Sequence, residues 1–216
     1  MSFKNNLKFI ICGTDTDVGK TLISSFFVRG LQSFYWKPIQ SGIDTETDSQ
    51  SILRLSGIQK KKILKEAYIF KKPVSPHWAA EIDGKKIDLN LLNLPSIDGS
   101  LVVETAGGLM VPITRNFLQI DQIRKWDLPV IIVCRSSLGT LNHTLLTIEA
   151  LKKRNIKILG LIINGEKHFD NPKTLREFSK LPIIAEFPRL SNIDKNNLDR
   201  LWQELNIEKK LASIIN

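Results

Sequence analysis

The amino-acid sequence predicts an α/β fold in which a parallel β-sheet is flanked by helices on both faces. Runs rich in β-branched residues, such as 9–12, 101–103 and 130–133, are apolar throughout, as strands buried on both faces are. Segments with apolar residues at helical spacing alternate with these runs. The 216 residues contain no internal repeat, linker or shift in composition, so we expect a single domain over residues 1–216.

The first predicted strand (9–12) runs into the sequence Gly-Thr-Asp-Thr-Asp-Val-Gly-Lys-Thr at 13–21, and a helix-like segment follows at 22–31. Such a turn directs backbone N–H groups, a helix N-terminus and one ammonium at a single point, which suits the phosphates of a nucleotide. Lys20 is expected to reach the β- and γ-phosphates, and the Thr21 hydroxyl to coordinate Mg²⁺. Five residues separate the two glycines, where four are usual. The sequence therefore predicts a variant phosphate-binding loop.

A second strand begins at 34–36 and leads into Lys37-Pro-Ile-Gln-Ser-Gly, which reads as a loop bounded by Pro and Gly. The carboxyl ends of parallel strands form the ligand crevice of an open sheet. We therefore expect Lys37 and Ser41 to share that crevice with the phosphate loop, although a lone lysine is more often a surface residue. A short helix is expected to start at Asp48, which has the position of a cap, and to end at Gly57.

The third strand, 101–103, is followed by Glu104 and then by Thr-Ala-Gly-Gly. An acidic residue at a strand end beside a phosphate loop is where nucleoside triphosphatases hold Mg²⁺, and burying an unpaired carboxylate there would be costly. Between these segments, Pro73 and Pro76 restrict the backbone before a helix near His77, which we interpret as a structural histidine.

The second half of the chain continues the alternation. Strands are expected at 130–133, 158–163 and 183–185, and helices at 138–151, 172–180 and around 198–205. Asn164 follows the fifth strand, where its amide could contact a base edge or simply occupy a turn.

The net charge of +9 and the isoelectric point of about 9.6 permit binding to nucleic acid, anionic membrane or small anions. The basic residues are dispersed, and the one run, 60–62, lacks interleaved aromatic residues, so we expect no nucleic-acid partner. No apolar stretch approaches the roughly 20 residues of a membrane span, and the start of the chain has no signal core. Cys12 and Cys134 are expected to be free thiols, and the protein to be cytoplasmic without a membrane partner.

Five motifs stand in a fixed order along the chain. They are Gly13-Thr-Asp-Thr-Asp-Val-Gly-Lys-Thr21, Trp36-Lys-Pro-Ile-Gln-Ser-Gly42, Ser75-Pro-His77, Glu104-Thr-Ala-Gly-Gly108 and Leu138-Gly-Thr-Leu-Asn-His143. Their order and spacing resemble the dethiobiotin synthetase family of P-loop NTPases. The resemblance spans nearly the whole chain, is weakest at 60–94 and after Pro188, and includes the five-residue gap in the loop.

The resemblance implies an ATP- and Mg²⁺-dependent cyclo-ligase of biotin biosynthesis, which closes the ureido ring of dethiobiotin from 7,8-diaminononanoate and CO₂. A substrate amine captures CO₂ as a carbamate, the carbamate attacks the γ-phosphate, and the second amine displaces phosphate from the mixed anhydride. The enzyme then mainly positions groups and neutralises charge. The family is dimeric, with substrate near the subunit interface and the segment 142–143 in that region.

The resemblance also implies roles for individual residues. Lys20 and Lys37 would be catalytic, Thr16 and Ser41 would hold the carbamate or amine end, and Thr21, Asp48 and Glu104 would surround the metal. The nucleotide-binding set would be Asp17, Val18, Gly19, Lys20, Thr21, Leu22, Asp48, Glu104, Thr105, Ala106, Gly107, Asn164, Gly165, Pro188, Arg189 and Leu190. Some relatives have Asn-Asp where this chain has Asn164-Gly165, so a carboxylate contact to the base is missing.

Two other classes share the scaffold. A regulatory P-loop ATPase that partitions DNA or recruits a partner to a membrane has the same α/β architecture, and fold alone does not exclude it. Such proteins tend to carry an additional lysine early in the loop, where this chain has Thr14 and Asp15. An amide-forming ligase of the same superfamily is the second alternative, and the short chain argues against it.

Overall fold

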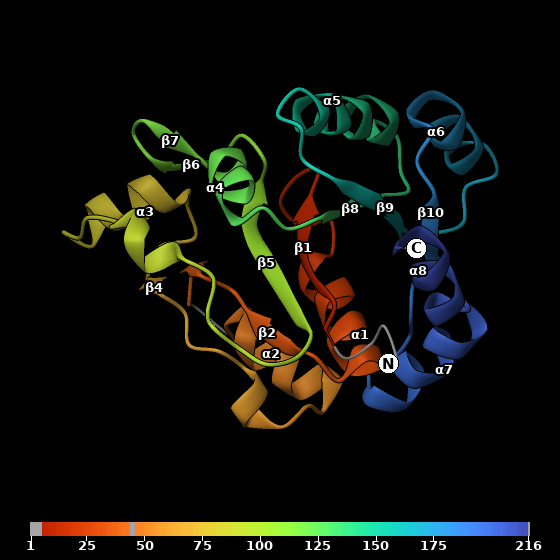
Figure 1. The fold of residues 1–216 in the computed structure, drawn as a ribbon, viewed down its shortest axis with the longest axis horizontal. Coiled ribbons are helices and arrows are strands. Elements are labelled where there is room, and N and C mark those ends of the chain that lie inside the picture. Colours follow the sequence, from red (N-terminus) through yellow and green to blue (C-terminus); the bar gives the residue numbers. More distant parts are fainter. Residues whose placement is uncertain (1–5, 44–45, 216) are drawn as a thin grey trace.

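A computed structural model describes residues 6–43 and 46–215. Its centre is a six-stranded sheet in which every neighbouring pair is parallel. In sheet order the strands are β10 (Ile183–Phe187), β9 (Ile158–Asn164), β8 (Val130–Arg135), β1 (Lys8–Gly13), β5 (Leu101–Gly108) and β2 (Phe34–Trp36). The predicted fold class is confirmed (Figure 1).

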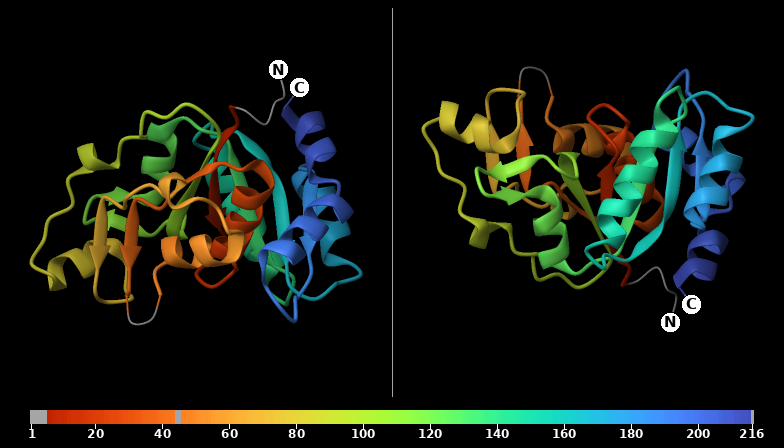
Figure 2. Two further views of the ribbon diagram at one scale, coloured as in Figure 1. Left: turned by 90° about the horizontal axis from the view of Figure 1, so that it is seen from below. Right: turned by 90° about the horizontal axis from the view of Figure 1, so that it is seen from above.

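Helices cover both faces of this sheet. On one face lie α1 (Lys20–Leu31), α2 (Asp48–Ser56), α7 (Lys195–Glu204) and α8 (Ile207–Ile215); on the other lie α4 (Gln119–Trp126), α5 (Thr140–Lys152) and α6 (Asn171–Ser179) (Figures 1 and 2). Within the described ranges, no helix combines the length and the hydrophobicity that crossing a membrane requires.

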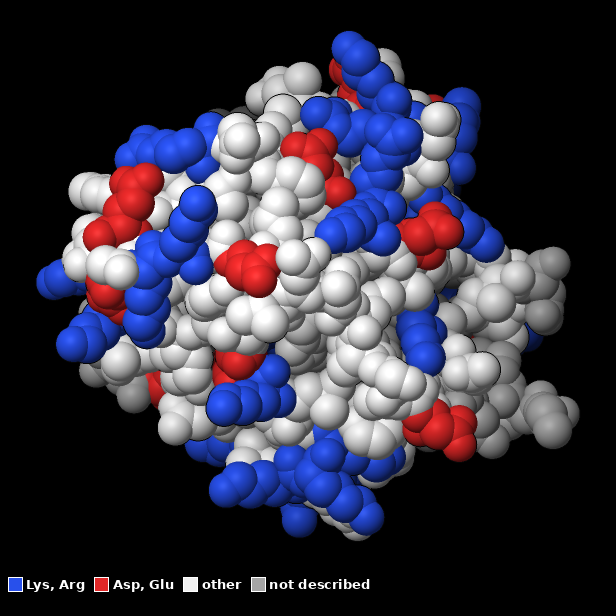
Figure 3. Space-filling model, turned by 60° about the vertical axis from the view of Figure 1, so that its left-hand side comes forward, with Lys and Arg blue, Asp and Glu red and all other residues white. Residues whose placement is uncertain are grey.

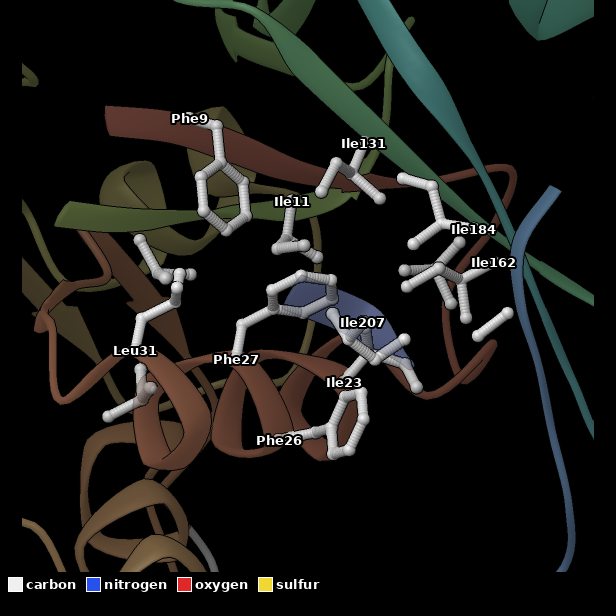
Figure 4. Close-up of a cluster of buried hydrophobic side chains, with 14 of the residues drawn as sticks. Phe9, Ile11, Ile23, Phe26, Phe27, Leu31, Ile131, Ile162, Ile184 and Ile207 are labelled. Carbon is white, nitrogen blue, oxygen red and sulfur yellow. The ribbon is translucent and has the colours of Figure 1, made fainter. Parts of the chain in front are cut away.

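The alternation of side chains along β1 explains why its sequence is apolar throughout. Phe9 and Ile11 belong to the core under α1, whereas Ile10 and Cys12 belong to the core on the opposite face, because successive strand residues point to opposite sides. Figure 4 shows Phe9 and Ile11 facing Phe27 of α1, and the rings of Phe9 and Phe27 meet edge to face at 5.2 Å. These contacts fix α1 against β1 and hence the loop between them.

The second strand, 34–36, is confirmed, but part of the loop expected after it forms a further strand. β2 ends at Trp36, and residues 39–41 form β3 (Ile39–Ser41), which pairs with β4 (Tyr68–Phe70) in a separate small sheet. Pro38 lies at the break and has no N–H for a continuing ladder. The remaining elements are α3 (Pro76–Ile82), the 3₁₀ turns at Lys60–Lys62 and Leu89–Leu92, and the hairpin of β6 (Pro112–Thr114) and β7 (Phe117–Leu118).

The interpretation of Asp48 as a helix cap is wrong. Thr47 caps α2, since its hydroxyl accepts from the N–H of Gln50 at 3.3 Å while the Gln50 side chain accepts from the Thr47 N–H at 2.8 Å. Asp48 is the first helical residue, and its carboxylate is available to the site described next. The end of the helix at Gly57 is as predicted.

Candidate active site

The loop between β1 and α1 has the predicted geometry. Gly19 precedes the helix with φ of 95°, and a Cβ there would lie 2.1 Å from the amide nitrogen of Asn164, so only glycine fits. No side chain caps α1, and the first N–H groups of a helix have no intrahelical partners. The ammonium of Lys20 donates to the carbonyl of Asp15 at 2.8 Å. Burial, followed by repulsion from Lys37, lowers the pKa of Lys20.

Arg135, at the end of β8, also holds this loop, and no motif in the chain indicates that role. Its guanidinium donates to the Asp15 carboxylate at 3.2 Å and to the carbonyl of Thr16 at 3.3 Å. The other carboxylate oxygen of Asp15 accepts from the Thr16 N–H at 2.7 Å. Asp15 is therefore bound on one side to the neighbouring strand and on the other to the loop.

Lys37 lies between two carboxylates at the centre of the site. Its ammonium donates to Glu104 Oε1 at 3.0 Å and to Asp48 Oδ2. The Thr21 hydroxyl lies 3.0 Å from Asp48 Oδ1 and 2.9 Å from Glu104 Oε1. Burial opposes the charged form of Lys37, but Glu104 and then Asp48 outweigh that effect and raise its pKa.

Glu104 is completely buried, and it lies in the middle of β5 and not at its end. The strand continues to Gly108, with an irregular register against β1 between Ile11 and Gly13. The second carboxylate oxygen of Glu104 accepts from the Tyr35 hydroxyl at 3.0 Å. The prediction of a strand end at Glu104 is therefore wrong, whereas the expected pairing of the buried carboxylate is confirmed.

A cleft of about 550 Å³ opens over this cluster. Among the predicted site residues it is lined by Thr16, Asp17, Gly19, Lys20, Thr21, Lys37, Ser41, Asp48, Glu104, Ala106 and Gly107. The Ser41 hydroxyl is buried and has no hydrogen-bond partner among the described residues. The sequence analysis assigned no site role to the remaining lining residues, which are Gln40, Pro73, Val74, Ser75, Pro76 and Val111, although Gln40, Ser75 and Pro76 lie within its motifs.

The other predicted residues do not line the cleft. The side chains of Val18 and Thr105 are buried, and the Thr105 hydroxyl lies 3.4 Å from the carbonyl of Ile11. Leu22 packs against the core under α1. These three residues can present only backbone groups to the phosphates.

A second predicted group, for the base, lies at the ends of β9 and β10. The Asn164 amide donates to the carbonyl of Val18 at 2.9 Å, and the Gly165 N–H donates to the carbonyl of Phe187 at 3.0 Å. Pro188 and Arg189 are exposed and Leu190 is half-buried; Arg189 lies 3.5 Å from the carboxylate of Glu166. Asn164 thus connects this group to the phosphate loop.

The oxygen atoms around Lys37 fit a hard divalent cation. No group of three or more His, Cys, Asp or Glu suited to a metal occurs in the described part of the chain, so the protein itself offers the two carboxylates of Asp48 and Glu104 and the hydroxyl of Thr21. Mg²⁺ prefers oxygen ligands and keeps positions for phosphate oxygens and water. This incomplete donor set is the kind that Mg²⁺ uses when it enters with a nucleotide.

Comparison with known structures places the fold. The septum site-determining protein MinD of Pyrococcus horikoshii, in complex with Mg-ADP, has a TM-score of 0.54 at 11% identity over 98% of this chain and 96% of that one. A ParA family ATPase from Chlorobium tepidum has a TM-score of 0.51 at 11% identity over 98% and 92%. The family model described as an AAA domain matches residues 8–197.

The fold and the phosphate loop together define a P-loop nucleotide-binding protein. Two relatives, both described as ATP-dependent dethiobiotin synthetase, are far closer in sequence. That of Rhodopseudomonas palustris (strain HaA2) is 46% identical over 88% of this chain and 89% of its own. That of Brucella anthropi is 42% identical over 92% and 94%. The chain therefore belongs to the ATP-dependent dethiobiotin synthetase family.

Proposed function

We propose that this chain forms dethiobiotin from 7,8-diaminononanoate, CO₂ and ATP at the cleft between the phosphate loop and Lys37. Its family consists of ATP-dependent ligases of biotin biosynthesis, and the fold fits nucleotide binding. The observation that carries the proposal is the convergence of five side chains on one cleft from α1, α2, β5 and the segment after β2: Lys20, Lys37, Thr21, Asp48 and Glu104.

The reaction needs no protein nucleophile. One amine of the substrate adds to CO₂ and loses a proton, a carbamate oxygen attacks the γ-phosphorus as ADP leaves, and the second amine attacks the carbamoyl carbon as phosphate leaves. Lys37 and Lys20 offset the negative charge that gathers at carbamate and phosphate. Thr16 and the unpartnered hydroxyl of Ser41 bind the carbamate or amine end.

The nucleotide is held largely by backbone groups. Residues 17–22 surround the phosphates, as the uncapped start of α1 supports. Ala106 and Gly107 form the opposite wall, and Thr105 contributes backbone groups only. Asn164, Gly165 and 188–190 lie beside the base. The Asn164 amide donates one N–H to the loop carbonyl, which leaves its oxygen and its second N–H to contact the base.

Thr21, Asp48 and Glu104 hold the Mg²⁺ that accompanies ATP. Bound there, Mg²⁺ offsets the charge of the phosphates during phosphoryl transfer. Replacing Glu104 by Gln should raise the Mg²⁺ concentration needed for half-maximal rate, whereas Glu81→Gln, in an exposed pair with Arg115, should not. An unchanged Mg²⁺ dependence in Glu104→Gln would leave Glu104 a structural residue.

One assay tests the function directly. The protein is incubated with ATP, Mg²⁺, bicarbonate and 7,8-diaminononanoate, and the cyclised product is sought by mass spectrometry together with stoichiometric phosphate. Omitting the diamine should abolish phosphate release beyond a low background. Phosphate release that is independent of the diamine, without cyclised product, would favour a regulatory ATPase.

We also propose a homodimer whose interface lies near the cleft. Support comes from three large apolar side chains that are exposed in the single chain: Leu138 at 99%, Leu146 at 56% and Met110 at 56%. Met110 and Leu146 border a hollow of about 390 Å³ that begins at residues 14–16 of the phosphate loop. Leu146→Glu should weaken the dimer in sedimentation equilibrium, while Phe178→Glu, at a side chain that is 72% exposed on α6, should not. A monomeric wild-type protein would exclude the dimer.

Nucleic acid is not among the proposed partners. On the face drawn in Figure 3 the Lys and Arg side chains form separate groups with acidic side chains between them. Any weak retention of duplex DNA should vanish between about 50 and 200 mM salt, while ATP binding persists. Tight duplex binding at the higher salt would contradict this.

The two buried free thiols, Cys12 and Cys134, support the cytoplasm as the location.

A further inference from the structure

Tyr35 contacts the candidate metal site from inside the core. Its side chain is fully buried, and its hydroxyl donates to Glu104 Oε2 at 3.0 Å. The other oxygen of the same carboxylate, Oε1, interacts with the Thr21 hydroxyl at 2.9 Å and the Lys37 ammonium at 3.0 Å. One carboxylate therefore has one oxygen facing the core and one facing the cleft.

The strand register explains how Tyr35 reaches that oxygen. β2 and β5 are parallel, and Tyr35 pairs with Val102. Val102 and Glu104 are two residues apart on β5 and so share a face of the sheet, and Tyr35 and Val102 lie in the same apolar cluster under α1. The long phenol ring spans the remaining offset along the strand. Its neighbour Trp36 belongs to the cluster on the opposite face.

Among the residues that the structure describes, only the Tyr35 hydroxyl donates a hydrogen bond to Glu104 Oε2, the oxygen that faces the core. A carboxylate oxygen with no donor in apolar surroundings is poorly solvated. Without the phenol, the carboxylate would turn to seek another donor, and Oε1 would lose its alignment with Thr21 and Lys37. Groups that hydrogen-bond a metal ligand orient it, and their loss typically weakens metal binding about 10- to 100-fold.

The geometry points to Tyr35 as a positioning residue that fixes the orientation of Glu104 for Mg²⁺ binding. Tyr35 does not line the cleft, so it acts on the metal only through Glu104. This inference rests on the proposed role of Glu104 as a metal ligand. It adds a residue outside the five motifs, because Tyr35 immediately precedes the second of them.

Tyr35→Phe removes one hydroxyl and keeps the ring, so it tests the inference with little change in packing. Mg²⁺ is titrated by calorimetry into each protein saturated with a non-hydrolysable ATP analogue. The apparent dissociation constant for Mg²⁺ should rise about tenfold in Tyr35→Phe. The matched control is Tyr68→Phe, which also loses a hydrogen-bonded hydroxyl, here the acceptor for the Asp88 N–H at 2.7 Å, and should leave Mg²⁺ binding unchanged.

The same substitution is then made together with Glu104→Gln. If Tyr35 acts through Glu104, it should have no further effect on Mg²⁺ binding in that background. The rise in melting temperature produced by Mg²⁺ with the analogue gives a second readout that is also usable for a less stable variant. If Glu104→Gln weakens Mg²⁺ binding but Tyr35→Phe binds Mg²⁺ with wild-type affinity, the inference is overturned. Unchanged Mg²⁺ affinity in Glu104→Gln would instead refute the proposed metal ligand itself.

Discussion

Replacing Lys37 by Met is expected to lower the stability of the protein as well as its activity. Methionine fills a similar volume but leaves Glu104 without its cation. The side chain of Lys37 is 7% exposed and that of Glu104 is not exposed at all, and their charged atoms lie 3.0 Å apart. Glu104 is therefore poorly solvated once the ammonium is removed.

The size of the effect follows from this burial. At 3.0 Å and an effective dielectric constant of about 20, two unit charges attract by about 5 kcal/mol, and removing one partner of a buried pair costs about 3–5 kcal/mol. For a chain of this length each kcal/mol corresponds to about 2–4 °C. The melting temperature of Lys37→Met should therefore fall by about 6–20 °C.

Second substitutions identify the cause. Adding Glu104→Gln removes the uncompensated charge and should restore a large part of the lost stability. Adding Asp48→Asn should restore less, because the Asp48 side chain is 26% exposed and water still solvates it. Thermal unfolding is followed by circular dichroism at neutral pH without ligands. A fall of less than about 2 °C in Lys37→Met, where several kcal/mol are expected, would refute the reasoning.

The same pair has a pH signature. Since the pKa of Lys37 is raised above its ordinary value of 10.5, its contribution to stability is complete below 10.5 and is lost as pH rises through the folded pKa. The difference in stability between wild type and Lys37→Met should therefore be constant near neutral pH and shrink only in the strongly alkaline range. A difference that shrinks on moving from pH 7 to 9 would assign the effect to another group.

Three further predictions concern the nucleotide end of the site. Burial, followed by repulsion from Lys37, lowers the pKa of Lys20, whereas bound phosphate favours its charged form. The affinity for ATP, measured by calorimetry, should therefore fall as pH rises above that lowered pKa. Lys20→Arg stays charged and should make the affinity less dependent on pH. Gly165→Asp should destabilise the protein by about 1–3 kcal/mol and not restore a carboxylate contact to the base. The reason is that Gly165 has φ of 133° and that a Cβ there would lie 2.5 Å from the Ser136 hydroxyl oxygen. A melting temperature equal to that of wild type would contradict this. Arg135→Ala should change the melting temperature by little. The side chains of Arg135 and Asp15 are 44% and 55% exposed, and exposed ion pairs contribute about 0–1 kcal/mol. A loss of several kcal/mol would show that the contacts of Arg135 with Asp15 and Thr16 are essential to the fold.

The sequence predicted the sheet because its signal is local. Each central strand must be apolar on both faces, so β1, β8 and β9 are visible as continuous runs. The short pieces were missed for the converse reason. The hairpin of β6 and β7 has strands of three and two residues, too few to show a period of two. The sequence pattern does not separate α8 from α7, because the apolar residues of α8 follow those of α7 closely. The helix is interrupted near Asn206, whose φ is 51°.

The site shows the same limit. Gly19, Lys20 and Thr21 are contiguous, so their chemistry is readable from the chain. Asp48 was ambiguous because both it and Thr47 are favourable capping residues, and only the three-dimensional structure shows which of them caps α2. Tyr35 was not recognised because a tyrosine within an apolar strand looks like core, and its partner is 69 residues away.

The order of strands explains why a site assembled from distant segments has such short distances. β5 is the fifth strand along the chain, yet in the sheet it lies between the first two, β1 and β2, and pairs with both. Glu104 therefore emerges between the loop that follows β1, which carries Lys20 and Thr21, and the segment after β2, which carries Lys37. A carboxylate between two cations is the arrangement that this topology makes possible, and the first residue of α2, Asp48, contacts Lys37 and Thr21. Moving Glu104 by one residue along β5 would point its side chain to the opposite face, so its contacts with Lys37 and Thr21 depend on the register of β5 as much as on the glutamate itself.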